Sequence, residues 1–322
     1  KAAWELFRQN HITENAGVVK RMRPWKKWAI AASPIGIVAI GGLLLLKKPG
    51  EENTAITRIV EPAIDKVTLI LPGNKKIILD SVTGSISQGV VNIDLQNESA
   101  VFSATENATT TAYNTILVPR GKKFQLRLED GTRVWLNADS RLRFPVKFTG
   151  EARQVEMEGE GYFEVAHAAQ RPFTVNYHNK AVRGLGTRFN IHAYGQEEAV
   201  TLLQGSIEWT GVQQSIQLNP GEQVQVNAQK VATRQVRADD YILWINNTLL
   251  LEQKSVQHLF NDIVRHYDVE VRYAATIPDS IKFNGAFEFP PTLDQMLSLM
   301  NSTGKVFAEK KENYVMVSLK AG

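Results

Sequence analysis

The stretch FQLRLEDGTRVWLN, residues 124–137, shows the pattern that decides the fold. Its first half alternates apolar and polar residues, which is the period of a strand that buries one face and exposes the other to water. Asp130-Gly131 is a turn signal, and a second strand-like run follows it. Residues 69–80 repeat this order of strand, tight turn and strand. Two similar hairpins indicate a stacked or layered β structure rather than a closed barrel.

The same period of two extends on both sides of this stretch, from residue 67 to residue 236. Turn signals such as Asn219-Pro220-Gly221 separate the runs, and no helical face longer than two turns interrupts them. We therefore predict an all-β domain over residues 67–238.

The pattern changes near residue 246 to apolar positions spaced for helices. It predicts a helix over 256–267 with Ser255 near its start, and a second helix that begins after Thr292 and ends at Gly304. Short alternating runs predict strands at residues 269–273, 281–289, 305–309 and 314–319. The order β-α-β followed by β-α-β-β is that of a small α+β domain, which we place at residues 245–319.

Upstream of the β domain, the apolar run WAIAASPIGIVAIGGLLLL occupies residues 28–46 without a charged residue. A helix of these 19 residues would be about 28 Å long, close to the roughly 30 Å hydrocarbon core of a bilayer. Five Lys and Arg closely precede the run and two Lys follow it, so we expect the N-terminus in the cytoplasm. A buried soluble helix or a cleaved signal peptide explains these flanks less well. The run predicts a single transmembrane helix.

This helix divides the N-terminal region into three predicted parts: a truncated cytoplasmic stub at 1–24, the transmembrane helix with its flanks at 25–48, and a linker at 49–66. The residues assigned to the anchor are interfacial tryptophans, weak helix formers and the last leucine: Trp25, Trp28, Pro34, Gly36, Gly41, Gly42 and Leu46. Proline and glycine are common in membrane helices, so they are either incidental or a means for the helix to unwind for an intramembrane protease.

The composition excludes several classes of protein. The 322 residues are 43% hydrophobic, too apolar for a largely disordered chain, and they include no cysteine, which excludes disulfides and thiolate chemistry. The net charge of +4 is uneven, because residues 1–50 hold nine Lys and Arg against two Glu, a charge of +7 that leaves −3 for the remainder. A mildly acidic body argues against direct binding to nucleic acid.

Catalytic templates are not matched. The six histidines form no H-E-x-x-H pair, Gly184-Leu-Gly186 lacks the third glycine of a dinucleotide loop, and Gly121-Lys122-Lys123 is not a phosphate loop. Glu156 and Glu158 alternate with apolar residues, as on the solvated face of a strand. We therefore expect a protein that is not an enzyme and has no cofactor or metal.

Six ordered motifs nevertheless make the chain resemble a known family. They are Val118–Gly121, Leu128–Pro145, Gly159–Val165, Arg171–Val175, Gly184–Asn190 and Leu218–Gln223. The chain resembles the FecR-type anti-sigma factors, in the form common in Bacteroidota, and the run from Trp244 to Val269 resembles that group's C-terminal domain, which is related to the STN fold of secretins and TonB receptors. The motif residues that we expect to build the fold are Asp130, Gly131, Thr132, Trp135, Leu136, Asn137, Gly159, Glu160, Tyr162, Phe163, Glu164, Val165, Pro172, Phe173, Gly186, Thr187, Phe189, Asn190, Pro220 and Gly221.

The resemblance implies a signal relay across the bacterial inner membrane. Its expected partners are an extracytoplasmic-function sigma factor bound through the N-terminal region, the periplasmic signalling domain of an outer-membrane TonB-dependent transporter, and envelope proteases. Both folded domains are expected in the periplasm. An edge strand of the β structure could accept a strand from a partner.

Two further hypotheses concern surfaces. Tyr273, Phe287 and Val315, on strands of the last domain, are candidates for docking a partner. The alternative function is a membrane-anchored carbohydrate-binding or envelope-scaffold module, which would need an exposed row of aromatic residues. Its candidates are Trp135, Tyr162 and Trp209, although Trp135 alone is better explained by packing.

Overall fold

The structure is a computed structural model, and it describes residues 65–79, 84–88, 90–96, 99–105, 112–195, 197–227 and 230–319. The stub at 1–24, the anchor at 25–48 and nearly all of the linker lie outside these residues. All described residues belong to one compact unit, Ala63–Gly322. Within them, no helix has the length and apolar character needed to cross a bilayer.

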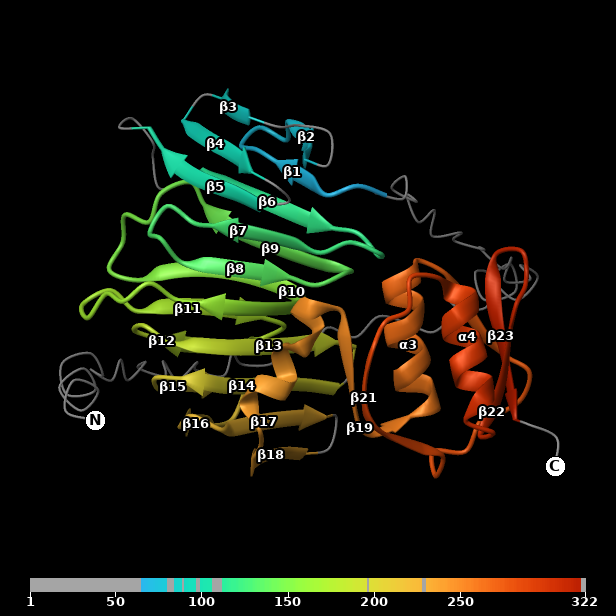
Figure 1. Cartoon of the computed structure of the whole chain (residues 1–322). Helices are drawn as coiled ribbons and strands as arrows, with labels where there is room; N and C mark the ends of the chain where they lie inside the picture. The colour runs from blue at the N-terminus through green and yellow to red at the C-terminus, as the bar shows by residue number, and fades with distance from the viewer. Residues whose placement is uncertain are drawn as a thin grey trace, which may run out of the picture. The chain divides into compact units, whose positions relative to one another are not determined.

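Eighteen strands form a single curled sheet built from two ladders (Figure 1). In the first ladder the strands lie in the order β2 (Lys76–Ile78), β1 (Thr68–Ile70), β6 (Tyr113–Val118), β9 (Ser140–Pro145), β10 (Arg153–Glu164), β11 (Phe173–Tyr177), β12 (Lys180–Gly184), β15 (Ile207–Thr210) and β16 (Ser215–Leu218). In the second ladder the order is β3 (Gly84–Gln88), β4 (Val91–Gln96), β5 (Ser99–Ala104), β7 (Phe124–Arg127), β8 (Arg133–Leu136), β10, β13 (Arg188–Tyr194), β14 (Glu197–Gln204), β17 (Glu222–Asn227) and β18 (Lys230–Gln235). We call these strands the β body.

The long strand β10 belongs to both ladders and switches between them at Gly159. Residues 153–158 pair with β11 and β9, whereas residues 159–164 pair with β8 and β13. Gly159 has a φ of +88°, and a Cβ there would collide with Ser140 and with the carbonyl of Asp139. Only glycine fits this crossing without strain. The motif glycine therefore marks the place where the sheet curls.

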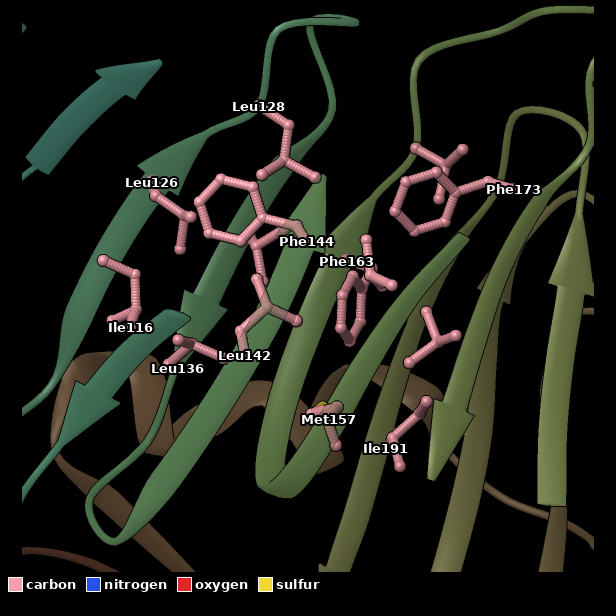
Figure 2. Close-up of a cluster of buried hydrophobic side chains, with 14 of the residues drawn as sticks. Ile116, Leu126, Leu128, Leu136, Leu142, Phe144, Met157, Phe163, Phe173 and Ile191 are labelled. Atoms are coloured by element: carbon pink, nitrogen blue, oxygen red, sulfur yellow. The ribbon is translucent and has the colours of Figure 1, made fainter. Parts of the chain in front are cut away.

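One hydrophobic cluster fills the space between the ladders. Figure 2 shows side chains of both ladders pointing toward one another. Leu142 and Phe144 of the first ladder share this cluster with Leu126 of the second. The Phe163 and Phe189 rings stack with their centroids 5.2 Å apart. The prediction of a mainly β protein is confirmed, as are the hairpins β1–β2 and β7–β8.

The remaining elements form a C-terminal lobe. They are the 3₁₀ helix η2 (Ala238–Asn246), β19 (Thr248–Ser255), α3 (Val256–Tyr267), β20 (Glu270–Tyr273), β21 (Lys282–Glu288), α4 (Leu293–Ser302), β22 (Val306–Lys310) and β23 (Tyr314–Leu319). The strands pair as β19-β21 and as β20-β23-β22, and the lobe has its own apolar cluster. The element order matches the α+β prediction, and both helices begin at the expected caps, Ser255 and Thr292.

The 3₁₀ helix was not predicted. Its nine residues connect β18 to β19 and bring Trp244 against the β body. The boundaries proposed for two domains, at residues 238 and 245, fall within or at this helix and stay a prediction.

Candidate functional site

A cavity of about 220 Å³ is lined by residues of both the β body and the C-terminal lobe. Polar side chains from the two parts meet around it. We call the following set the joint: Lys123, Asn137, Glu160, Asn190 and His192 from the β body, with Trp244, Asn247 and Arg265 from the lobe.

The buried carboxylate of Glu160 lies at the centre of the joint. It accepts hydrogen bonds from the amide of Asn190 at 3.0 Å and from the amide of Asn137 at 2.8 Å, and His192 Nδ1 lies 3.3 Å away. Burial by itself raises the pKa of Glu160, but His192 and the two amides outweigh it and hold the pKa below its usual range. Glu160 is thus an ionised group in a site built to keep it ionised.

Asn190 connects this carboxylate to the lobe. Its side-chain oxygen accepts a hydrogen bond from the indole N–H of Trp244 at 3.2 Å, while its amide nitrogen donates to Glu160. Trp244 is buried. The amide of Asn190 is therefore oriented from both sides, because an ionised carboxylate can only accept and an indole can only donate.

Lys123 makes the second connection. Its ammonium donates to the backbone carbonyl of Trp244 and to Asn247 Oδ1, the latter at 2.6 Å. Burial lowers the pKa of Lys123 to about 8, although Glu160 opposes this shift. A lysine that loses most of its hydration is held in place here by oxygen atoms of the lobe.

The end of α3 makes a third connection. The backbone N–H of Gly121 donates to the carbonyl of Arg265 at 2.8 Å. The guanidinium of Arg265 lies 3.6 Å from the ring centroid of Tyr194, a cation–π geometry, and also contacts Asp262 at 2.9 Å. The last turn of α3 thus contacts the β body through the backbone hydrogen bond to Gly121 and through the Arg265 side chain, which stacks on Tyr194.

One side of the cavity is bounded by an ion pair. Arg234 of β18 contacts both carboxylate oxygens of Glu252 on β19, at 2.7 and 2.9 Å, and the hydroxyl of Tyr241 also bonds to Glu252. Hydrogen bonds from Arg234 are the first cause that lowers the pKa of Glu252. His266, at another side of the cavity, stacks on Phe289 with centroids 3.8 Å apart, and burial lowers its pKa to about 4.

The motif residues Asp130 and Thr132 belong to a different buried centre, inside the β body. Arg153 donates to Asp130 Oδ2 at 2.6 Å, and Asp130 also accepts from the backbone N–H and the hydroxyl of Thr132. Arg153 is only 2% exposed and also donates to the carbonyls of Ala166 and Arg171. We call Asp130 with Arg153 the body centre. It closes the turn at Gly131, whose φ is +87°.

Most other motif residues are buried in the β body or form its turns. Trp135 lies against Tyr162 with ring centroids 5.3 Å apart, and Glu164 pairs with Arg133. Gly221 has a φ of +84° in the turn before β17. The other buried or half-buried motif positions are Leu136, Phe163, Val165, Pro172, Phe173, Gly186, Thr187 and Phe189, whereas Pro220 is exposed in its turn. Among the motif residues, Asn137, Glu160 and Asn190 go beyond this role, because they build the joint.

Two surface predictions need correction. Val315 is fully buried in β23, the central strand of its sheet, so its side chain offers no docking surface. Tyr273 and Phe287 are half-buried against the lobe's apolar cluster, and their role in docking stays a prediction. The row of exposed aromatic residues is not formed either, since Tyr162 is 4% exposed and Trp209 is 1% exposed.

Two other predictions concern metal binding and the membrane anchor. Within the described residues, no cluster of three or more His, Asp or Glu side chains is arranged to hold a metal ion. The anchor residues lie outside those residues and stay a prediction: Trp25, Trp28, Pro34, Gly36, Gly41, Gly42 and Leu46.

Five residues of the joint are not among the predicted site residues: Lys123, His192, Trp244, Asn247 and Arg265. Trp244 and Arg265 lie within the run that resembles the C-terminal family domain, but nothing in that run says what they contact. Lys123 lies in the sequence Gly121-Lys122-Lys123, for which the sequence excludes a phosphate loop and indicates no other role. The available signal is the position of Trp244, between the period-two pattern of the β domain and the helical pattern of the C-terminal domain.

Comparisons with known proteins agree with this architecture. The family model described as FecR protein matches residues 114–208, and the model described as FecR, C-terminal, matches residues 248–317. Two crystal structures of a proposed anti-sigma factor from Parabacteroides distasonis are 27% identical in sequence; they superpose with TM-scores of 0.61 and 0.62, covering 64% and 65% of this chain and 99% and 100% of theirs. No curated protein gives a significant match. The two family models, in this order along one chain, show that it belongs to the FecR family of anti-sigma factors, which are regulators and not enzymes.

Proposed function

We propose that this chain is a single-pass anti-sigma factor of the bacterial inner membrane. The observation that carries the proposal is the match to both the FecR and the FecR C-terminal models, in that order. The apolar run at 28–46, with its cationic flank on the N-terminal side, supports a membrane anchor upstream of both. The β body and the lobe would then lie in the periplasm.

The signal would come from the outer membrane. The periplasmic signalling domain of a TonB-dependent transporter contacts the periplasmic part of the chain, envelope proteases cut the chain, and the N-terminal region acts on an extracytoplasmic-function sigma factor. A sigma factor is the partner that the family implies. Proteolysis suits a single helix, because a cut converts one binding event into an irreversible signal.

The lobe has a surface on which a partner protein could dock, at the outer edge of β22. Strand β22 pairs with β23 and, among the described strands, with no other, so its second edge is a place for strand addition. Phe307 on β22 is 49% exposed, and Leu319, paired with β22, is also exposed. An edge strand flanked by apolar side chains favours a protein partner over solvent.

The topology is tested with reporters fused after Gly322 of the full chain. Alkaline phosphatase, which is active only outside the cytoplasm, is expected to be active, and a fluorescent protein that matures only in the cytoplasm is expected to stay dark. The reverse pattern would overturn the relay.

The partner is tested separately. The full chain in detergent is titrated by calorimetry with the periplasmic signalling domains of TonB-dependent transporters from the same organism. Binding in the micromolar range is expected, and a matched signalling domain from an unrelated transporter is the control. Equal binding of all these domains, or of none, counts against the proposed relay.

A further inference from the structure

We infer that the joint is a latch that seats the C-terminal lobe on the β body, and that opening this latch is how the lobe passes a docking event to the rest of the chain. The inference rests on the proposed function for its biological meaning. The latch itself is argued from contacts in the described residues and can be tested without any partner.

Among the residues that the structure describes, the β body and the lobe have separate apolar cores. The two hydrophobic clusters have no residue in common, and Trp244, the large side chain between them, belongs to neither. What joins the two parts is instead hydrogen bonds, an ion pair and a cation–π contact. Polar contacts of this kind are typical of interfaces that open and close, whereas large apolar interfaces are typical of permanent ones.

Seating of the lobe is cooperative because the joint is one connected network. Glu160 orients Asn190, Asn190 accepts from Trp244, and the carbonyl of Trp244 accepts from Lys123. When the lobe leaves, Asn190 Oδ1 and the Lys123 ammonium lose these partners together. Groups that must be satisfied together favour two discrete states, seated and unseated, over a gradual drift.

The cavity provides room for the second state. Close-packed cores resist small movements, but about 220 Å³ of space lies directly beside Glu160, Trp244 and Arg265. The ion pair between Arg234 and Glu252 bounds this space from the neighbouring strands β18 and β19. A shift of the lobe can therefore begin without deforming either core.

The position of Glu160 connects the latch to the whole β body. Glu160 directly follows Gly159, where β10 passes from the first ladder to the second. Its backbone N–H donates to Ser140 Oγ at 2.9 Å, and Ser140 lies at the start of β9 in the first ladder. A movement of Glu160 therefore affects the second ladder, to which it belongs, and the first ladder through its backbone hydrogen bond to Ser140.

The test measures seating directly by the distance between two spin labels. Since the chain has no cysteine, Thr210→Cys on the body and Ser298→Cys on the lobe can be labelled selectively, and both positions are exposed. The full labelled chain in detergent is expected to give one narrow distance distribution. Glu160→Gln and Trp244→Phe should add a second, broader population, because each removes one hydrogen-bonding group of the joint.

Both variants are chosen to keep the fold. Glu160→Gln keeps the size of the side chain, and Trp244→Phe keeps an aromatic ring while it removes the indole N–H. Loss of the neutral hydrogen bond from Trp244 to Asn190 lowers the ratio of seated to unseated molecules roughly 2- to 10-fold. Glu160→Gln acts through the orientation of Asn190, because the hydrogen bonds of Glu160 itself lie within the β body, and it should lower the ratio by less. The matched control is Glu156→Gln, on the same strand but exposed and paired with Arg143, which should leave the distribution unchanged.

Signalling is measured with the same variants in cells that carry a reporter driven by the cognate sigma factor. Glu160→Gln and Trp244→Phe are expected to change reporter output without the inducing ligand, whereas Glu156→Gln is not. An unchanged distance distribution in both variants overturns the latch. A changed distribution with unchanged reporter output overturns its role in signalling. If the parent chain itself never affects the sigma factor, the proposed function fails, and the spin-label result still decides whether the latch exists.

Discussion

The body centre and the joint are two of the buried charged centres in the described residues, and their surroundings differ. In the body centre, Asp130 and Arg153 take the partners named above from the β body alone. In the joint, Glu160 has its amide partners in the β body, but one of them, Asn190, passes the contact on to Trp244 of the lobe. The body centre therefore stabilises the β body alone, whereas the joint connects the β body to the lobe.

The comparison teaches how to separate a stabilising charge from a coupling charge. Each centre contains a carboxylate from a family motif, Asp130 in one and Glu160 in the other, and each holds charged side chains largely out of water. Burial alone therefore does not distinguish them. What does distinguish them is whether removing the charge should disturb the whole β body or only the seating of the lobe, and this can be measured.

The largest effect is expected at the body centre, in Asp130→Asn. The substitution leaves the guanidinium of Arg153 buried without its charged partner, which costs about 3–5 kcal/mol of unfolding free energy. Chemical denaturation followed by circular dichroism should show this loss across the β signal. Asp139→Asn is the control, because Asp139 pairs with Arg120 in an exposed position. If both variants lose equal stability, the body centre does not have the role given to it.

Asp130 also shows which features of the fold could be predicted from the sequence and which could not. The Asp-Gly-Thr turn, the hairpins and both helices of the lobe follow from local patterns, since alternation, turn residues and helix caps act over a few positions. The partner of Asp130 does not, because Arg153 is 23 residues away in sequence.

Burial of Val315 and Trp209 was missed for a related physical reason. Both residues alternate as strand residues should, but the sequence does not say which strand lies in the centre of a sheet or which face lies under another ladder. Glu160 shows the same limit most clearly. It continues the alternation of Glu156 and Glu158, yet the crossing at Gly159 takes it out of solvent and into the joint.

An intermediate effect is expected from Gly159→Ala, because Gly159 lies on β10 between Arg153 of the body centre and Glu160 of the joint. A residue with a Cβ would have to adopt a φ near +88° and would collide with Ser140, which together costs about 2–3 kcal/mol. This variant should both destabilise the β body and broaden the spin-label distances. Gly150→Ala, where the added Cβ meets only ordinary contacts, should do neither. A Gly159→Ala protein of normal stability would contradict the crossing described for β10.

The smallest effect is expected at His266, which lines the cavity from the lobe beside the joint, and this effect depends on pH. The pKa of His266 is lowered to about 4 by burial, first of all, and by Lys123, whereas an unfolded chain would have a value near 6.5. As the pH falls below about 6.5, the unfolded state therefore binds a proton that the folded state does not, and stability declines until about pH 4.

For a half-buried group, solvent reduces the effect to roughly 1–2 kcal/mol at pH 4.5 relative to pH 7.5. Unfolding free energies of the parent and of His266→Gln, measured at both pH values, isolate this contribution from that of His192 and the other histidines. The variant should lose less stability on acidification than the parent. His167→Asn, at an exposed position that does not line the cavity, should instead follow the parent. Since His266 lines the cavity beside Trp244, acidification should also broaden the spin-label distances in the parent more than in His266→Gln. If acid reduces stability equally in both proteins, the titration of His266 does not contribute to the stability of the folded chain.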